Sequence, residues 1–247
     1  MRSLTKNKWK KYLFLKNYGP LVPYLPETQR LSGHSFNALL QKYHNVIVKP
    51  VWGSRGRGVI QVSYLGHNRY AIHYENVRKV GRGRRNAYRY IRGKIGPAEY
   101  MIQRRIHRPT INNRPFDMRV IVQRKQYSSQ WVVTAKVVKV AGKGYIVSNN
   151  SRSKGQLLKF STGIRNSSIR HLPINALESQ INGVSILTAK RLARFFPGHR
   201  IYGLDIATNQ HGRVSIIEAN LYPSMSHFYK LKDRTVYQRI LAYKQGW

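Results

Sequence analysis

The spacing of apolar residues along the chain predicts four helices. They lie at residues 6–17, 32–43, 176–196 and 233–244. In the second of these, Phe36, Leu39 and Leu40 recur at the interval that places side chains on one helix face. The third ends at Pro197-Gly198, residues that cannot easily continue a helix. Each of these helices can therefore present an apolar face to a core.

Short apolar runs between the helices predict β-strands. They lie at residues 46–50, 58–64, 69–75, 100–103, 116–123, 131–140, 201–207 and 214–220. Several neighbouring runs are joined by short turns rich in Gly, Asn or His, a pattern that favours antiparallel hairpins. The sequence therefore predicts a mixed α+β fold.

Two segments have less regular patterns. Residues 78–94 contain eight Lys or Arg and no acidic residue, and suit either a basic helix or an exposed loop. Residues 148–170 are rich in Ser, Asn, Lys and Arg and are expected to form an exposed loop. We find no internal repeat and no change in composition that marks a linker. The length therefore fits one large domain, or two lobes that share a site.

The charge of the chain restricts its partners. There are 45 Lys or Arg against 8 Asp or Glu, a formal net charge of +37. Such a field attracts nucleic acid, anionic polymers, nucleotides or acidic protein surfaces. With 41% hydrophobic residues the chain can also bury a core, which excludes a disordered basic tail.

Cysteine and long apolar segments are missing from the sequence. The absence of cysteine excludes disulfides, thiolate zinc sites and cysteine nucleophiles. The apolar run near the N-terminus, from Tyr12 to Leu15, is too short for a signal-peptide core. No stretch approaches the ~20 apolar residues of a membrane span. We therefore expect a soluble, cytoplasmic protein.

Two of the eight acidic residues occupy a predicted hairpin. Asp205 and Glu218 lie in apolar strands on either side of a turn at residues 208–213, so pairing can bring them together. Asn220 is two residues after Glu218 and points to the same face. Carboxylate and amide oxygens are hard ligands that suit Mg²⁺ bridged to phosphates. An edge hairpin with solvated polar residues is the alternative, but the neighbouring Ile and Ala residues favour burial.

A phosphate-binding loop is a second candidate feature. Lys49 ends a strand and leads into Gly53-Ser-Arg-Gly-Arg-Gly58, whose backbone amides can cradle phosphate oxygens. The spacing differs from that of a P-loop, in which the lysine follows the glycines. A flexible turn beside a surface lysine explains the same residues.

Other polar groups allow more than one interpretation. Asp117 and Arg119 share a face of a strand, so Asp117 can orient Arg119 toward a phosphate, or the two form a local ion pair. The Arg-Gly pieces near residues 55–58 and 81–85, with tyrosines close by, can bind nucleic acid or belong to a generally basic surface. The nine histidines show no metal-ligand spacing.

Taken in order along the chain, these motifs resemble the ATP-grasp superfamily, and most closely its YheC/YheD-type branch, described as endospore coat-associated. The resemblance covers about residues 6–225. Its motifs are Tyr24-Leu-Pro-Glu-Thr28, Val48-Lys-Pro-Val-Trp-Gly-Ser-Arg-Gly-Arg-Gly58, Tyr100-Met-Ile-Gln103, Arg114-Pro-Phe-Asp-Met-Arg119, Val147-Ser-Asn149, Gly203-Leu-Asp205 and Ile217-Glu-Ala-Asn220 with Pro223.

The resemblance implies an ATP-grasp fold, in which two α+β lobes with antiparallel sheets enclose ATP. It implies a single ATP-grasp domain over residues 1–247, with a smaller lobe at about 45–105. The N-terminal domain that relatives usually carry is expected to be absent. Arg104 and Arg105 depart from the acid or aromatic that relatives often have between the lobes, and Arg152-Ser-Lys-Gly155 replaces a frequent Gly-Gly.

The resemblance also assigns roles to residues. Lys8 and Lys49 would contact the nucleotide, the loop of Gly53, Ser54, Gly56 and Gly58 would cover the phosphates, and Arg119 would contact a phosphate. The segment between the lobes, with Gln103, Arg104, Arg105 and Ile106, would meet the adenine. Asn149 would face the same site. Asp205, Glu218 and Asn220 would hold one or two Mg²⁺ ions.

The family's usual chemistry is carboxylate activation: ATP phosphorylates a carboxylate, and an amine attacks the acylphosphate. Arg119 and Lys49 would be the catalytic cations. We therefore expect a Mg-ATP-dependent carboxylate–amine ligase whose substrate is an acidic protein or polymer, with association to spores implied by the resemblance. Two alternatives stay open: a non-catalytic polyanion-binding or spore-structural protein on the same fold, and a basic nucleic-acid-binding domain.

Overall fold

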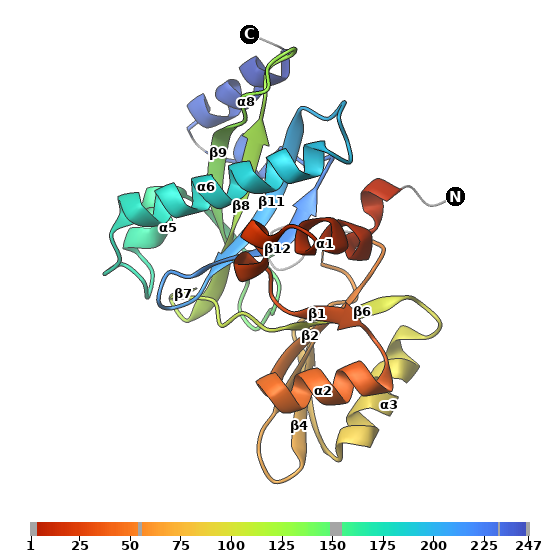
Figure 1. The fold of residues 1–247 in the computed structure, drawn as a ribbon. Coiled ribbons are helices and arrows are strands. Elements are labelled where there is room, and N and C mark those ends of the chain that lie inside the picture. Colours follow the sequence, from red (N-terminus) through yellow and green to blue (C-terminus); the bar gives the residue numbers. More distant parts are fainter. Residues whose placement is uncertain (1–3, 54–55, 149–154, 232, 246–247) are drawn as a thin grey trace.

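The fold consists of two lobes, each built on an antiparallel sheet (Figure 1). A computed structural model describes residues 4–53, 56–148, 155–231 and 233–245. Within these ranges each sheet has six strands. None of the helices in these ranges is both long enough and apolar enough to cross a membrane.

The first lobe has the strand order β1-β6-β2-β3-β4-β5. Its elements are β1 (Thr28–Arg30), α2 (Gly33–Tyr43), β2 (Asn45–Pro50), β3 (Ile60–Tyr64), β4 (Arg69–Tyr74), β5 (Val77–Arg82), α3 (Arg84–Ile95) and β6 (Tyr100–Arg104). Helices α2 and α3 cover one face, where Phe36 and Ile91 are fully buried against Val48 and Ile102. The lobe therefore includes α2, which precedes residue 45.

The second lobe has the order β10-β9-β8-β11-β12, with β7 paired to β8. Its elements are β7 (Thr110–Ile111), β8 (Arg114–Gln123), β9 (Val132–Val140), β10 (Gln156–Lys159), α5 (Phe160–Arg165), α6 (Ile174–Ala193), β11 (Ile201–Thr208), β12 (Val214–Asn220), α7 (Ser226–Tyr229) and α8 (Thr235–Gln245).

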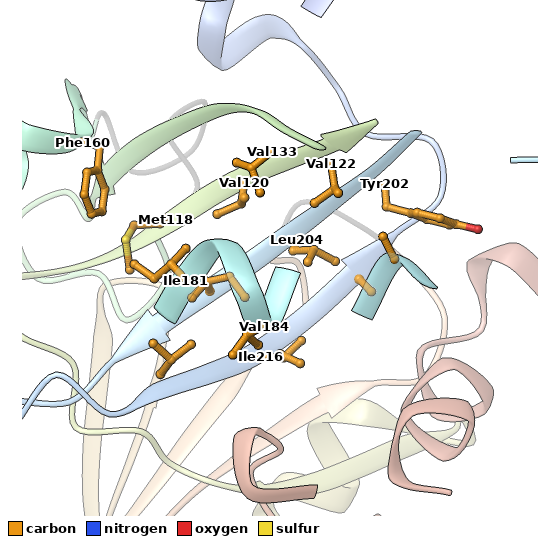
Figure 2. Close-up of a cluster of buried hydrophobic side chains, with 14 of the residues drawn as sticks. Met118, Val120, Val122, Val133, Phe160, Ile181, Val184, Tyr202, Leu204 and Ile216 are labelled. Atoms are coloured by element: carbon orange, nitrogen blue, oxygen red, sulfur yellow. The ribbon is translucent and has the colours of Figure 1, made fainter. Parts of the chain in front are cut away.

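Alternation along β8 decides which side chains enter which layer. Met118 and Val120 point toward α6, where they meet Ile181 and Val184 in the larger core (Figure 2). Ile121 is on the opposite face, in a second core with Phe228 and Ile240 that α8 covers. Asp117 and Arg119 have the same parity as Ile121 and are therefore kept out of the larger core.

The N-terminal segment connects the lobes. It comprises η1 (Leu4–Lys6), α1 (Lys8–Lys16) and η2 (Gly19–Tyr24). Helix α1 begins after Asn7, whose side chain accepts a hydrogen bond from the Lys10 N–H. The Lys8 N–H donates to the Val51 carbonyl after β2, at 3.0 Å. The Lys11 ammonium donates to the Ala219 carbonyl in β12, at 2.6 Å. One helix is therefore bonded to both lobes.

The predicted helices and hairpins are confirmed, and two segments need correction. Residues 78–94 form most of strand β5 and most of helix α3, so the predicted alternatives of a basic helix or an exposed loop missed a strand. The exposed loop predicted for 148–170 is wrong in part, because β10 and α5 lie within it. Phe160 and Ile164 of α5 are buried. The burial of these few apolar side chains stabilises regular structure in a segment whose composition is mostly polar.

Candidate functional site

Asp205 and Glu218 lie opposite each other in the β11–β12 hairpin. They are register partners, and the pairing shifts immediately after Asp205. Asn220 is two residues beyond Glu218 and has the same parity in β12. All three residues line one cavity. The pairing that the sequence predicts across this turn is therefore confirmed.

The cavity has a volume of about 450 Å³ and is lined by residues of both lobes. In the described part of the chain, eight Lys or Arg side chains and three carboxylates line it, an excess of cations that suits a polyphosphate. The three carboxylates are Asp117, Asp205 and Glu218, out of eight acidic residues in the whole chain. The lining includes these predicted site residues: Lys8, Lys49, Gly56, Gln103, Arg104, Arg105, Ile106, Arg119, Asp205, Glu218 and Asn220.

The structure describes two of the four other predicted site residues and leaves two undescribed. Gly53 and Gly58 are described but do not line the cavity, although the Lys8 ammonium donates a hydrogen bond to the Gly53 carbonyl. Ser54 and Asn149 lie outside the described residues. The loop itself requires glycine: Gly58 has φ +71°, and a Cβ there would lie 2.5 Å from the Tyr100 hydroxyl.

Lys49 extends from β2 toward the second lobe. Its ammonium donates to Gln103 Oε1 at 2.8 Å and to the Ile217 carbonyl at 3.2 Å. Gln103 in turn donates to the Thr28 hydroxyl at 2.7 Å, which fixes the amide. Burial lowers the pKa of Lys49 to about 8, although Glu218 acts in the opposite direction. The side chain is therefore mostly protonated at neutral pH, and an incoming phosphate would favour the charged form further.

Arg119 is held by Asp205. Its Nε and Nη2 atoms donate to the two carboxylate oxygens at 3.0 and 3.1 Å, a bidentate pair. Lys139 donates to Asp205 Oδ1 at 2.7 Å and forms an ion pair with Asp117 Oδ1 at 2.8 Å. Burial alone would raise the pKa of Asp205, but Arg119 and Lys139 outweigh it and hold that pKa below its usual range.

The interpretation that Asp117 orients Arg119 needs correction. Asp117 pairs with Arg108 at 2.9 Å and with Lys139, while Arg119 pairs with Asp205. Register explains the difference: Arg119 lies directly opposite Asp205 in β11, and Asp117 lies directly opposite Lys139 in β9. Cross-strand neighbours are closer than residues two apart along one strand, so they take the ion pairs.

The oxygen donors fit a magnesium ion that arrives with a polyphosphate. Mg²⁺ is commonly bound through one or two carboxylates together with phosphates, without a cage made only of protein ligands. Among the described residues, no group of three or more His, Cys, Asp or Glu forms such a cage. Glu218 is the more available donor, since its nearest cation, Lys8, is 4.0 Å away. Both oxygens of Asp205 already contact cations.

Sequence reasoning missed three polar residues that line the cavity. Lys139 is one of them, and its only signal is a lysine in a mostly apolar strand that also contains Thr134 and Lys136. Arg108 also lines the cavity, but it lies after the end of β6, where no helix or strand pattern in the sequence marks it. His227 also lines the cavity; burial, with Lys139 next, lowers its pKa to about 4, so its imidazole is neutral at physiological pH. The Nδ1 atom of His227 is buried without a hydrogen-bond partner among the described residues.

Sequence comparison finds distant relatives of this chain. Endospore coat-associated protein YheD of Bacillus subtilis (strain 168) is 24% identical over 227 residues, covering 90% of this chain and 49% of that protein. Endospore coat-associated protein YheC of the same strain is 22% identical over 222 residues, covering 88% of this chain and 60% of that protein. The chain thus spans about half to three fifths of the length of these curated relatives.

Solved structures with a similar fold are ligases and synthetases. D-cycloserine synthetase DcsG has a TM-score of 0.57 at 10% identity, covering 98% of this chain and 70% of that one. D-alanyl-alanine synthetase A of Vibrio cholerae has a TM-score of 0.55 at 12% identity, covering 98% and 64%. N5-carboxyaminoimidazole synthase of Aspergillus clavatus, solved with ADP and 5-aminoimidazole ribonucleotide, has a TM-score of 0.54 at 10% identity, covering 90% and 46%.

These structural similarities confirm the predicted fold class, α+β with the two antiparallel sheets of an ATP-grasp fold. A sequence profile described as YheC/D like ATP-grasp matches residues 2–245, nearly the whole chain. The chain therefore belongs to the YheC/D-like ATP-grasp family.

Proposed function

We propose that this protein binds Mg-ATP in the cavity between its lobes and acts as an ATP-dependent carboxylate–amine ligase. The acceptor would be an acidic polymer or protein, activated as an acylphosphate. The observation that carries the proposal is the composition of one cavity. It gathers Lys8, Lys49 and Arg119 against the oxygen donors Asp205, Glu218 and Asn220.

Each of these groups has a role in binding and orienting. Lys8 and Lys49 hold phosphate oxygens, and the backbone of residues 101–106 meets the adenine. Arg119, fixed by two hydrogen bonds, stabilises charge on the transferring phosphoryl group. Asp205, Glu218 and Asn220 would hold Mg²⁺, which when bound neutralises phosphate charge. An acceptor carboxylate oxygen attacks the γ-phosphorus and ADP leaves; an amine nitrogen then attacks the acyl carbon, loses a proton and displaces phosphate.

The similarities to known proteins support ATP as the ligand and an association with spores. One structural neighbour was solved with ADP, and several are ligases or synthetases by name. The curated relatives are named as endospore coat-associated proteins, and we extend that association with spores to this chain. The net charge of +37 supports an acidic acceptor.

One observation favours a second candidate, a polyanion-binding protein without turnover. Both oxygens of Asp205 contact cations of the chain itself, which a metal would have to displace or share. A protein that keeps these pairs would bind phosphates through its cations alone, with no requirement for magnesium.

Thermal unfolding at high salt distinguishes the two candidates. Mass action at one hundred times Kd stabilises the folded state by about 2.7 kcal/mol. For a chain of this length we therefore expect Mg-ATP to raise Tm by roughly 5–10 °C. Mg-GTP, Mg-pyrophosphate and ATP with a chelator should raise it less. Glu218→Ala should lose the magnesium-dependent part.

The matched control is Glu178→Ala, which removes a carboxylate that pairs with Lys136 and does not line the cavity. It should keep the full response to Mg-ATP. An equal response to every phosphate, unchanged by Glu218→Ala, would exclude the magnesium site and leave the polyanion-binding candidate. A response to Mg-ATP alone would support the nucleotide site and justify a search for the acceptor.

A further inference from the structure

Strand β5 forms an outer edge of the first sheet. It pairs with β4 on one side, and within the described residues no strand pairs with its other side. All six of its residues are exposed. Two of them are large and apolar: Val77 is 38% exposed and Val80 is 52% exposed. An edge strand of this kind is a template for pairing with another extended chain.

The hydrogen bonds of the hairpin show which backbone groups face outward. Tyr74 and Val77 are partners across a two-residue turn, and the Gly83 N–H donates to the Asn68 carbonyl at 2.9 Å. Hydrogen-bonded and non-hydrogen-bonded pairs alternate in an antiparallel ladder. The N–H and C=O groups of Arg78, Val80 and Arg82 are therefore turned away from β4. All three residues offer outward N–H donors, and Arg78 and Val80 also offer acceptors. The Arg82 carbonyl already accepts a hydrogen bond from the Asn86 side chain at 3.1 Å.

The positive charge of β5 and the residues after it favours an acidic partner. Residues 77–94 contain no acidic residue, and β5 itself carries Arg78, Lys79 and Arg82. A second copy of the chain would bring the same cations into register, and like charges directly opposite each other destabilise a strand pair. A partner with alternating carboxylates would instead place its negative charges beside Arg78 and Arg82.

The aromatic rings on this side favour a polypeptide over nucleic acid. Single-stranded nucleic acids bind by stacking bases on exposed aromatic faces. Here the Lys94 ammonium lies 3.6 Å from the ring centre of Tyr74, and Lys79 lies 5.3 Å from that of Tyr90. A lysine thus already occupies one face of each of these rings. Val77 and Val80 offer apolar contacts of the kind that a neighbouring strand uses.

We propose that the outer edge of β5 binds an extended acidic polypeptide segment as an added strand. Backbone hydrogen bonds from Arg78, Val80 and Arg82 fix its register, and the arginine side chains bind its carboxylates. Arg78 lies opposite His73, and His73 lies opposite Gln61, which lines the cavity. The bound segment therefore extends the sheet whose face forms one wall of the cavity. This docking surface does not require ATP binding.

Fluorescence anisotropy with a fluorescein-labelled peptide of alternating Glu and Val tests the proposal, at ~0.15 M salt where distant charges are screened. Val80→Pro removes an outward N–H and exchanges one apolar side chain for another, while the hydrogen bonds between β4 and β5 stay in place. We expect it to weaken binding about tenfold. Arg78→Glu with Arg82→Glu should weaken it by at least about tenfold. The control, Arg170→Glu with Lys190→Glu, makes the same charge change at exposed positions on the other lobe and should bind nearly as the parent does.

Amide hydrogen exchange of the parent protein gives a readout that needs no variant to fold. Peptide binding should slow exchange at Arg78, Val80 and Arg82 while leaving Lys79 unchanged. Unprotected outward amides, or full binding by Val80→Pro, would overturn strand addition. An equal loss in the control variant would mean general charge attraction and would also overturn it. So would tighter binding of an oligothymidylate of equal charge.

Discussion

Lys139 joins two carboxylates from different strands in the interior of the protein. Its side chain is 8% exposed, and it pairs with Asp117 at 2.8 Å and with Asp205 at 2.7 Å. Burial lowers the pKa of Lys139, but the two aspartates reverse the effect, and the net shift is upward. Removing one member of a buried ion network leaves charge without compensation, which costs more than the intact network contributes.

Lys139→Met should therefore destabilise the protein by about 3 kcal/mol at neutral pH. Since Lys139 keeps the folded pKa of Asp205 low, its contribution is fully present above the ordinary carboxylate pKa. It is lost as pH falls through the folded value. The stability difference from the parent should shrink on acidification. Urea unfolding followed by fluorescence at several pH values measures this.

Lys143→Met is the control, because Lys143 is exposed near the same part of the chain. It should change the free energy of unfolding by less than about 0.5 kcal/mol. Equal effects of the two substitutions, or an effect of Lys139→Met that grows in acid, would contradict the importance of the buried pairs.

At the scale of elements, the loop between β2 and β3 depends on backbone conformation. Gly58 has φ +71°, and the Tyr100 hydroxyl lies close to where a Cβ would be placed. Gly93, inside α3, has an ordinary helical backbone, and a Cβ added there would meet nothing within 4 Å. The two glycines therefore respond in opposite directions to the same added methyl group.

Gly58→Ala should destabilise the protein by about 1–2 kcal/mol because alanine is strained in the left-handed region. It should also reduce the stabilisation by Mg-ATP, if the loop covers the phosphates. Gly93→Ala should be neutral or stabilise by up to about 1 kcal/mol, since alanine favours a helix interior. Thermal unfolding of both variants, with and without nucleotide, measures the pair. A neutral Gly58→Ala would show that the loop adapts freely.

The elements also show what a sequence can predict. Periodicity identified helix α2, which buries one face. Two apolar runs on either side of a turn identified the β11–β12 hairpin, and this pairing placed Asp205 opposite Glu218. The sequence of strand β5 shows no alternation of apolar and polar residues, since none of its side chains is buried. The pairing of Arg119 with Asp205 required the order of strands in the sheet, which local patterns do not contain.

At the scale of the whole molecule, the net charge of +37 works against folding. Self-repulsion destabilises a compact chain, and salt screens it, with a Debye length of about 10 Å at 0.1 M. We expect Tm to rise as sodium chloride increases from about 0.02 to 0.3 M. Chloride is chosen because sulfate or phosphate would bind the cavity. A Tm that falls with chloride would indicate that attractive ion pairs outweigh the repulsion.

Helix α1 gives the arrangement of the lobes a mechanical consequence. Its first residue is bonded to the Val51 carbonyl of one lobe, and Lys11, one turn later, to the Ala219 carbonyl of the other. Any rotation of the lobes that leaves both bonds intact must have its axis close to this helix. Lys8, at that axis, would move least during such a rotation, while parts of the first lobe farther from α1 would move through longer arcs. Opening of the cavity between the lobes would thus leave Lys8 in place while the more distant parts of the first lobe move away.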